Sequence, residues 1–247
     1  MRRIVIFGPA KTGTTALYYK VRSAISDSRI FDQFEPRAYS EPANPVEFDY
    51  SLSKCLLAND LSLDYSKYQD FEHIIYLVRD PRDWIVSAIL FRMRGPEIAG
   101  NPKAISAVVD ILRNKEAAPR SVSVSEMLER YAQYAGHDLV ALVAWIRNLQ
   151  IWLQGFETYF ENSFTFRYEN LVDSNLKGLG EYLRFSLPDG QAVVAESVDH
   201  VIRTKSYGNW QHWFLESDVA LFKPIFSRYI DRHGYSNNWT LSERPEL

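Results

Sequence analysis

Residues 8 to 15 read GPAKTGTT and directly follow the apolar run Ile4 to Phe7. The two glycines of this segment let the backbone turn tightly and approach a ligand closely. From Gly13 onward the residues can open a helix, whose free N–H groups and positive dipole end favour an anion. The segment, called the anion loop below, is therefore predicted to bind a phosphate-type group at the end of a first β-strand.

The position of the lysine in the anion loop distinguishes two kinds of reaction that such a loop can support. A nucleoside triphosphatase loop has the pattern GxxxxGK[ST], and this chain keeps both glycines but has Thr14 in the lysine position. Its lysine, Lys11, comes two residues before the second glycine. A triphosphatase needs an ammonium group on the β- and γ-phosphates and Mg²⁺ nearby. A lysine earlier in the loop can instead neutralise a phosphate oxygen that serves as a leaving group.

A second motif, RDPRDWIVS, spans residues 79 to 87. Arg79 ends an apolar run and offers a planar set of donors for a phosphate, and Ser87 adds a hydroxyl from the helix that follows. Asp80 and Pro81 are an N-cap and a first helical residue, so a helix is predicted to start there. Two other interpretations exist: Asp80 as a Mg²⁺ ligand at a strand end, or Arg79 in a local ion pair with Asp80 or Asp83.

Two further segments carry candidate ligand-binding residues. RTKSYGNW, residues 203 to 210, contains two cations and a glycine. Taken alone, this segment is as consistent with a basic surface loop and a packed tryptophan. FRYENLVD, residues 166 to 173, reads as a short strand that runs into a helix, with Tyr168 at the junction. Tyrosine can stack and donate a hydrogen bond, or simply pack.

The elements that position these motifs alternate along the chain. Strand patterns occur at Ile4 to Phe7, Ser53 to Ala58, His73 to Val78 and Ser163 to Arg167, with helical patterns between them, which favours an α/β fold with a parallel sheet. The stretch from about residue 96 to 160 is helical in composition and reads as an insertion or lid. Nothing in the 247 residues demands a second domain.

Composition narrows the function classes. A net charge of −3 argues against a general nucleic-acid or membrane-surface binder. The single cysteine, Cys55, excludes an internal disulfide framework and suits a reducing compartment. No uninterrupted apolar stretch approaches the roughly eighteen residues that a membrane span needs. We therefore expect no transmembrane segment and a cytoplasmic location.

Together these motifs resemble sulfotransferases that use 3′-phosphoadenosine 5′-phosphosulfate (PAPS). The run K-[ST]-G-T-T is similar to their 5′-phosphosulfate loop, and Arg79 and Ser87 match their 3′-phosphate signature. Residues 203 to 210 are similar to the C-terminal R-K-G-x-x-G-x-W segment, although Lys205 replaces its first glycine. Tyr168 matches a tyrosine that contacts the adenine. Ala16 stands where the family has an aromatic residue.

The resemblance implies a three-layer, P-loop-like α/β fold with a mainly parallel central sheet. It also implies transfer of a sulfuryl group from PAPS to a hydroxyl or amine, with adenosine 3′,5′-bisphosphate (PAP) as product and no metal. The acceptor would be a small molecule, a carbohydrate or a lipid. The nucleotide contacts would come from Lys11, Thr12, Gly13, Thr14, Thr15, Arg79, Ser87, Tyr168, Arg203 and Lys205.

Lys11 would meet the bridging oxygen of the bond that breaks, and a base would take the proton of the acceptor. The K-T-H run that supplies a histidine in part of the family is absent, because the chain has Ala58-Asn59-Asp60. Glu35 resembles the glutamate of the carboxylate-using branch and is the first candidate, with Asp60 second. Two other functions stay open: a Mg²⁺-dependent P-loop kinase or NTPase, and a catalytically inactive nucleotide-binding protein.

Overall fold

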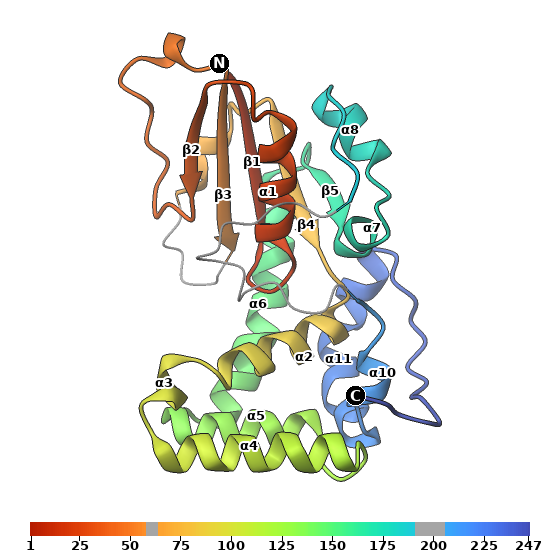
Figure 1. The fold of residues 1–247 in the computed structure, drawn as a ribbon. Coiled ribbons are helices and arrows are strands. Elements are labelled where there is room, and N and C mark those ends of the chain that lie inside the picture. The colour runs from red at the N-terminus through yellow and green to blue at the C-terminus, as the bar shows by residue number, and fades with distance from the viewer. Residues whose placement is uncertain (58–63, 191–205) are drawn as a thin grey trace. The chain divides into compact units, whose positions relative to one another are not determined.

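The computed structural model describes residues 1–57, 64–190 and 206–247. The chain divides into two compact units (Figure 1), each described here by itself. The sheet unit comprises Met1–Arg79 and Trp152–Ser206, and the helical unit comprises Asp80–Ile151 and Tyr207–Leu247. The single domain with an insertion at residues 96–160 stays a prediction.

The described part of the sheet unit contains a five-stranded sheet in the order β2-β3-β1-β4-β5, and every pairing between neighbours is parallel. This confirms the predicted α/β class. The strands are β1 Arg2–Pro9, β2 Ile30–Phe34, β3 Tyr50–Leu57, β4 His73–Val78 and β5 Phe164–Arg167. Four of them match the predicted runs, whereas β2 is an additional edge strand.

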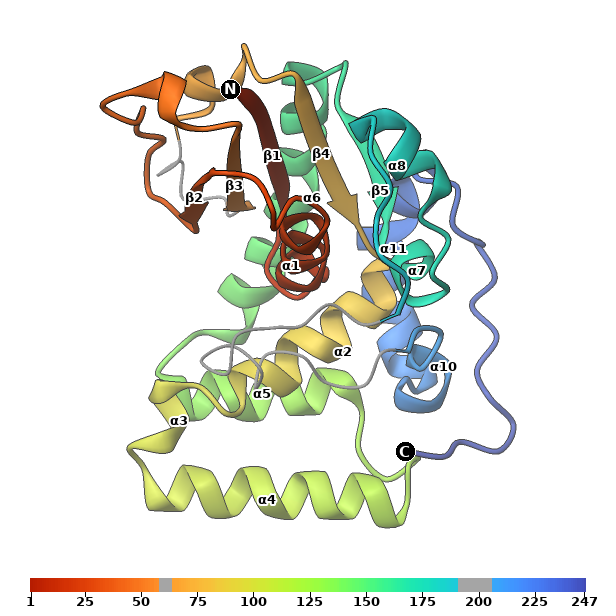
Figure 2. The same ribbon diagram turned by 45° about the horizontal axis from the view of Figure 1, so that its top comes forward.

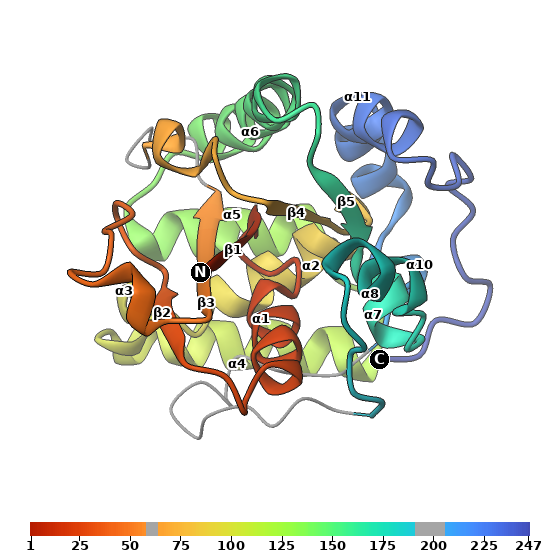
Figure 3. The same ribbon diagram turned by 90° about the horizontal axis from the view of Figure 1, so that it is seen from above.

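Helices cover both faces of this sheet, as the view along it shows (Figure 3). On one face lie α1 (Thr14–Ala24) and α8 (Lys177–Leu183), and on the other lies the end of α6 (Leu139–Tyr159). The short α7 (Tyr168–Val172) follows β5, and the 3₁₀ turns Pro45–Glu47 and Tyr65–Tyr68 lie in connections. The result is a three-layer unit with α helices on either side of a parallel sheet.

The alternation of β1 side chains explains these layers. Ile4 and Ile6 join a fully buried cluster with Leu17 of α1 and Leu179 of α8. Phe7 points to the opposite face, where its ring centroid lies 5.0 Å from that of Phe156 and 5.5 Å from that of Phe160. Because β1 is buried on both faces, its carboxyl end and the anion loop that follows are held by the core.

The helical unit contains most of the stretch from about residue 96 to 160 that was predicted to be helical. Figures 1 and 2 show its helices, among which α4 and α5 run alongside each other. They are α2 Pro81–Arg92, α3 Pro96–Ala99, α4 Pro102–Ala117, α5 Val124–Ala135, α10 Trp210–Trp213 and α11 Glu216–Arg232, with the first part of α6. As predicted, Asp80 is the N-cap of α2, because its side chain accepts the backbone N–H of Arg82 at 2.9 Å.

The helical unit is held together partly by two buried charges. Lys115, at the end of α4, is fully buried and donates to the carbonyls of Pro119, Val122 and Trp213 at 2.6, 2.5 and 2.6 Å. Asp218 of α11 is also fully buried and accepts the N–H groups of Val124 and Ser125. Lys115 therefore satisfies main-chain carbonyls of the α4–α5 connection and of the end of α10, and Asp218 satisfies N–H groups at the start of α5.

Within the described residues, α6 is long and apolar enough to cross a membrane by length and composition. Its residues Ile146, Leu149, Leu153 and Phe156 are buried at helical spacing. A buried stripe of this kind is also what a helix packed on a protein core shows. The absence of a membrane span therefore stays a prediction.

Candidate anion-binding and transfer site

The anion loop joins β1 to α1 with the tight geometry that its glycines predict. Gly13 is the N-cap of α1 with φ 93°, in the left-handed region. A Cβ on Gly8 would come within 2.8 Å of Thr12 Oγ1 and 2.9 Å of the carbonyl oxygen of Leu77. The Thr12 hydroxyl donates to the carbonyl of Pro9 at 2.7 Å and closes the turn. The loop is thus closely packed and needs glycine at both positions.

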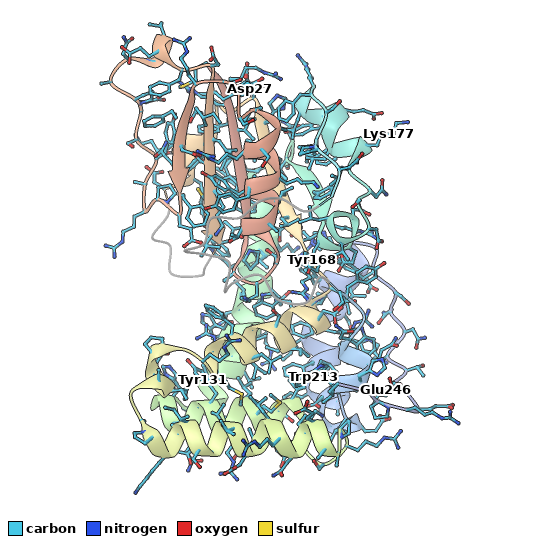
Figure 4. The ribbon with its side chains drawn as sticks, in the orientation of Figure 1. Asp27, Tyr131, Tyr168, Lys177, Trp213 and Glu246 are labelled. Carbon is cyan, nitrogen blue, oxygen red and sulfur yellow. The ribbon has the colours of Figure 1, made fainter. Side chains whose placement is uncertain are left out.

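Tyr168, labelled in Figure 4, lies against this loop. A Cβ on Gly13 would lie 2.5 Å from Tyr168 Cδ2, so the ring packs directly on the glycine backbone. The same ring lies 4.4 Å from the guanidinium carbon of Arg79. Tyr168 is 9% exposed. In the sheet unit it is therefore a wall of the anion loop, and a contact with adenine stays a prediction.

Arg79 connects the end of β4 to the anion loop. Its Nη1 donates to the carbonyl oxygen of Lys11 at 2.9 Å. Lys11 itself has φ 70°, an uncommon conformation for a residue with a side chain. The structure thus brings the guanidinium group of Arg79 against the backbone of Lys11, a residue 68 positions away in the sequence. An arginine beside a loop that contains a lysine and opens a helix is suited to an anionic ligand.

The sequence interpretation missed a third cation, Lys54 of β3. Its side chain is 1% exposed, and its Nζ donates to Thr15 Oγ1 at 3.1 Å and to Glu35 Oε1. Burial lowers the pKa of Lys54, while the hydrogen bond and charge of Glu35 act in the opposite direction. The available signal was a lysine within the strand pattern that begins at Ser53, followed directly by Cys55, Leu56 and Leu57, since lysine is rarely buried without a partner.

Glu35, the first candidate base, follows the last residue of β2. Its side chain is 40% exposed, so its carboxylate is anchored by Lys54 and still reachable from solvent. Its backbone N–H donates to the carbonyl of Lys54 at 2.8 Å, and its φ of 53° lies in the left-handed region. Lys54 thereby links the candidate base to the hydroxyl of Thr15 in the first turn of α1.

Ser87 belongs to the helical unit, where it lies half-buried on α2. In the same unit, Asp83 of α2 accepts the backbone N–H groups of Gly208 at 2.6 Å and Trp210 at 3.0 Å. These two residues belong to the C-terminal motif, so α2 holds the end of that motif. This role of Asp83 was not predicted.

Asp80 is engaged by Arg82, whose Nη2 lies 2.6 Å from its Oδ2. The guanidinium carbon of Arg82 lies 4.1 Å from the ring centroid of Trp210. A carboxylate that caps a helix and pairs with arginine favours a structural role over Mg²⁺ binding. Among the described residues, no group of three or more His, Cys, Asp or Glu side chains is placed to hold a metal ion.

Three predicted site residues, Asp60, Arg203 and Lys205, lie outside the described residues. The role of Asp60 as an alternative base and the roles of Arg203 and Lys205 at the nucleotide stay predictions. The candidates that belong to the sheet unit are Lys11, Thr12, Gly13, Thr14, Thr15, Glu35, Arg79 and Tyr168.

Comparison with solved structures identifies the fold. The chain is similar to a mouse sulfotransferase, SULT7A1, whose crystal structure was determined in complex with PAP. The alignment covers 93% of this chain and 85% of that chain, with a TM-score of 0.55 and 16% sequence identity. No family model and no curated protein sequence matches the chain. At this identity the likeness shows a shared P-loop-like α/β fold.

Proposed function

We propose that the protein is a sulfotransferase that moves a sulfuryl group from PAPS to a hydroxyl or amine acceptor. The observation that carries the proposal is the placement of its cations around the anion loop. Thr14, which is 3% exposed, occupies the helix position where a triphosphatase has its lysine. Lys11 instead lies within the loop with Arg79 against its carbonyl. The fold, shared with a sulfotransferase solved with PAP, supports the same function.

The 5′-phosphate end of the nucleotide would lie on the anion loop. Backbone N–H groups of Thr12, Gly13, Thr14 and Thr15 and the dipole of α1 would stabilise its charge. Arg79, with Ser87, Arg203 and Lys205, would bind the 3′-phosphate, as the resemblance implies. A ligand with phosphates at both ends of its ribose explains why the chain carries an anion loop and a separate arginine motif.

Transfer would proceed by in-line displacement at sulfur. The acceptor oxygen or nitrogen forms the new bond to sulfur, while the bond between sulfur and the bridging 5′-phosphate oxygen breaks. The electron pair of that bond stays on the phosphate, and PAP leaves. Lys11 would stabilise the charge that develops on the bridging oxygen. No step of this displacement requires a metal ion.

Glu35 would take the proton of the acceptor as the new bond forms. Its exposed fraction makes it accessible, and the ion pair with Lys54 holds its carboxylate in place. Because Lys54 also contacts Thr15, the base would be fixed relative to the first turn of α1. Lys54 is in this proposal a positioning residue, and Asp60 is the alternative base.

The acceptor in this proposal is a small molecule, a carbohydrate or a lipid, and the reaction takes place in the cytoplasm. The acceptor class follows from the family resemblance. The cytoplasmic location is supported by the single cysteine, which suits a reducing compartment.

Two measurements test the proposal. A thermal-shift comparison should show stabilisation by PAP and none by Mg·ATP, whereas stabilisation by Mg·ATP alone would indicate a kinase or NTPase. Radiolabelled PAPS should then transfer its sulfate to at least one member of a panel of phenols, glycans and sphingolipids. Binding of PAP with no transfer to any acceptor would instead identify an inactive nucleotide-binding protein.

A further inference from the structure

Arg79 makes two kinds of contact that are not needed for binding a phosphate. Its Nη1 donates to the Lys11 carbonyl at 2.9 Å, and its guanidinium plane lies over the ring of Tyr168. Tyr168 in turn packs on Gly13 of the anion loop. Arg79 therefore supports the loop at two points, directly through Lys11 and indirectly through the ring.

The Nε atom of the Arg79 guanidinium group has a different environment from Nη1. Within the described part of the chain, Arg79 Nε is buried and has no hydrogen-bond partner. Buried donors in native proteins almost always have partners, so an unsatisfied one marks a place where a ligand oxygen would be favourable. An oxyanion that accepts from Nε would fix the plane of the guanidinium, and with it the direction of the Nη1 bond to Lys11.

Lys11 needs such support because its backbone is left-handed at φ 70°. This conformation is unfavourable for a residue with a Cβ and persists only where surrounding contacts hold it. The hydrogen bond from Arg79 is a contact of this kind. Whatever fixes Arg79 therefore also favours the loop conformation that sets the direction of the Lys11 side chain.

We propose that Arg79 is a positioning residue for the anion loop, and that it couples the 3′-phosphate and 5′-phosphate subsites energetically. The inference rests on the proposed function, because it takes the oxyanion at Nε to be the 3′-phosphate. Coupling is reciprocal: if the 3′-phosphate favours the binding-competent loop, the 5′-phosphate favours the anchored arginine to the same extent. The sulfuryl donor would thus be held for reaction best when both of its phosphates are bound.

The test uses ligands with and without the 3′-phosphate on the full chain. Titration calorimetry gives the affinities of PAP and of adenosine 5′-phosphate for wild type, Arg79→Met, Arg79→Lys and Ser87→Ala. Lys177→Met is the control for loss of one positive charge, since this side chain of the same unit is 87% exposed. Thermal unfolding without ligand shows whether each variant is folded.

Both Arg79 variants are expected to bind adenosine 5′-phosphate on the order of fivefold to tenfold more weakly, although this ligand has no 3′-phosphate. Arg79→Lys should regain part of the PAP affinity through its charge but none of the adenosine 5′-phosphate affinity, because an ammonium group cannot reproduce the planar arrangement. Ser87→Ala should weaken PAP alone. If Arg79 had only a general structural role, each Arg79 variant would instead lose affinity for PAP and for adenosine 5′-phosphate in the same proportion.

Normal affinity of both Arg79 variants for adenosine 5′-phosphate would overturn the inference and leave the proposed function standing. If Arg79→Met does not fold, Arg79→Lys alone decides the outcome. Wild-type protein that binds no PAP would overturn the proposed function, and the coupling with it, because no 3′-phosphate site would exist.

Discussion

Lys54 and Glu35 form an ion pair in which the cation is buried and the carboxylate is half-exposed. The same ammonium donates to the hydroxyl of Thr15. This arrangement fixes a carboxylate beside the first turn of the helix that follows the anion loop. The proposed base therefore has a defined position. Because Glu35 and Lys54 can be replaced one at a time, the contribution of the base can be measured apart from that of the lysine that holds it.

Replacement of Glu35 by Gln should strongly reduce sulfate transfer while leaving PAP binding intact. The amide still accepts a hydrogen bond from Lys54 but cannot take a proton, so turnover should fall roughly 10²- to 10⁴-fold. Single-turnover transfer with radiolabelled PAPS measures this. Glu47→Gln, an exposed glutamate in the connection after β2, is the matched control. Full activity of Glu35→Gln together with loss in Asp60→Asn would move the base to Asp60.

Replacement of Lys54 by Met should reduce transfer without unfolding the protein. Methionine fills a similar volume and removes the cost of burying a charge, and Glu35 stays partly solvated, so the melting temperature should be unchanged or higher. Turnover should fall on the order of 100-fold because the base loses its fixed position. Thermal denaturation and transfer assays on the same sample check both parts. A large drop in melting temperature with normal residual turnover would contradict the positioning role.

Gly13→Ala should both destabilise the protein and remove nucleotide binding. A left-handed residue with a Cβ costs about 1–2 kcal/mol. The new methyl group would also lie 2.5 Å from the ring of Tyr168. Gly155→Ala on α6 is the control, because nothing lies within 4 Å of its Cβ position and helix propensity favours alanine. Denaturant titration of both variants, followed by PAP titration, distinguishes them; equal stability of the two would contradict the geometry of the loop.

Stability should decrease as the pH falls below about 6.5, and His73 should contribute to this. Burial, followed by the charge of Arg2, lowers the pKa of His73, so the unfolded state binds a proton more readily than the folded state. The contribution is therefore complete above the unfolded pKa and is lost as the pH falls through the folded pKa. Melting temperatures of wild type and His73→Gln from pH 7.5 to 5 test this. A steeper decline in the variant would reverse the predicted sign.

Cys55 should be unreactive in the native protein. It is fully buried and donates to the hydroxyl of Tyr68, and burial raises its pKa to about 12, so almost no thiolate exists at pH 8. Because the chain has one cysteine, the labelling rate reports directly on opening of the core. Labelling with a thiol reagent in buffer and in denaturant measures this. Rapid labelling of folded protein would contradict the burial of β3.

The sequence was sufficient to predict the tight turn between β1 and α1, the start of α2 and the class of the fold. In each case the signal was local: glycine spacing after an apolar run, an Asp-Pro cap, and strands that alternate with helices. The strand β2 was missed because Asp32 and Gln33 interrupt its apolar pattern, as edge strands allow. The ion pair of Lys54 and Glu35 depended on that strand, since the pairing of β2 with β3 places Phe34 opposite Lys54. A long-range register cannot be read from residue types alone.

Lys115 offers a last consequence for the helical unit. Its ammonium group has three protons and donates three hydrogen bonds, one to each of the main-chain carbonyls of Pro119, Val122 and Trp213. The side chain therefore ties the end of α4 to α10 much as a structural zinc ion or a disulfide fastens a small domain. These hydrogen bonds require neither a disulfide nor a bound metal ion. They can therefore form in a reducing compartment and without a metal supply.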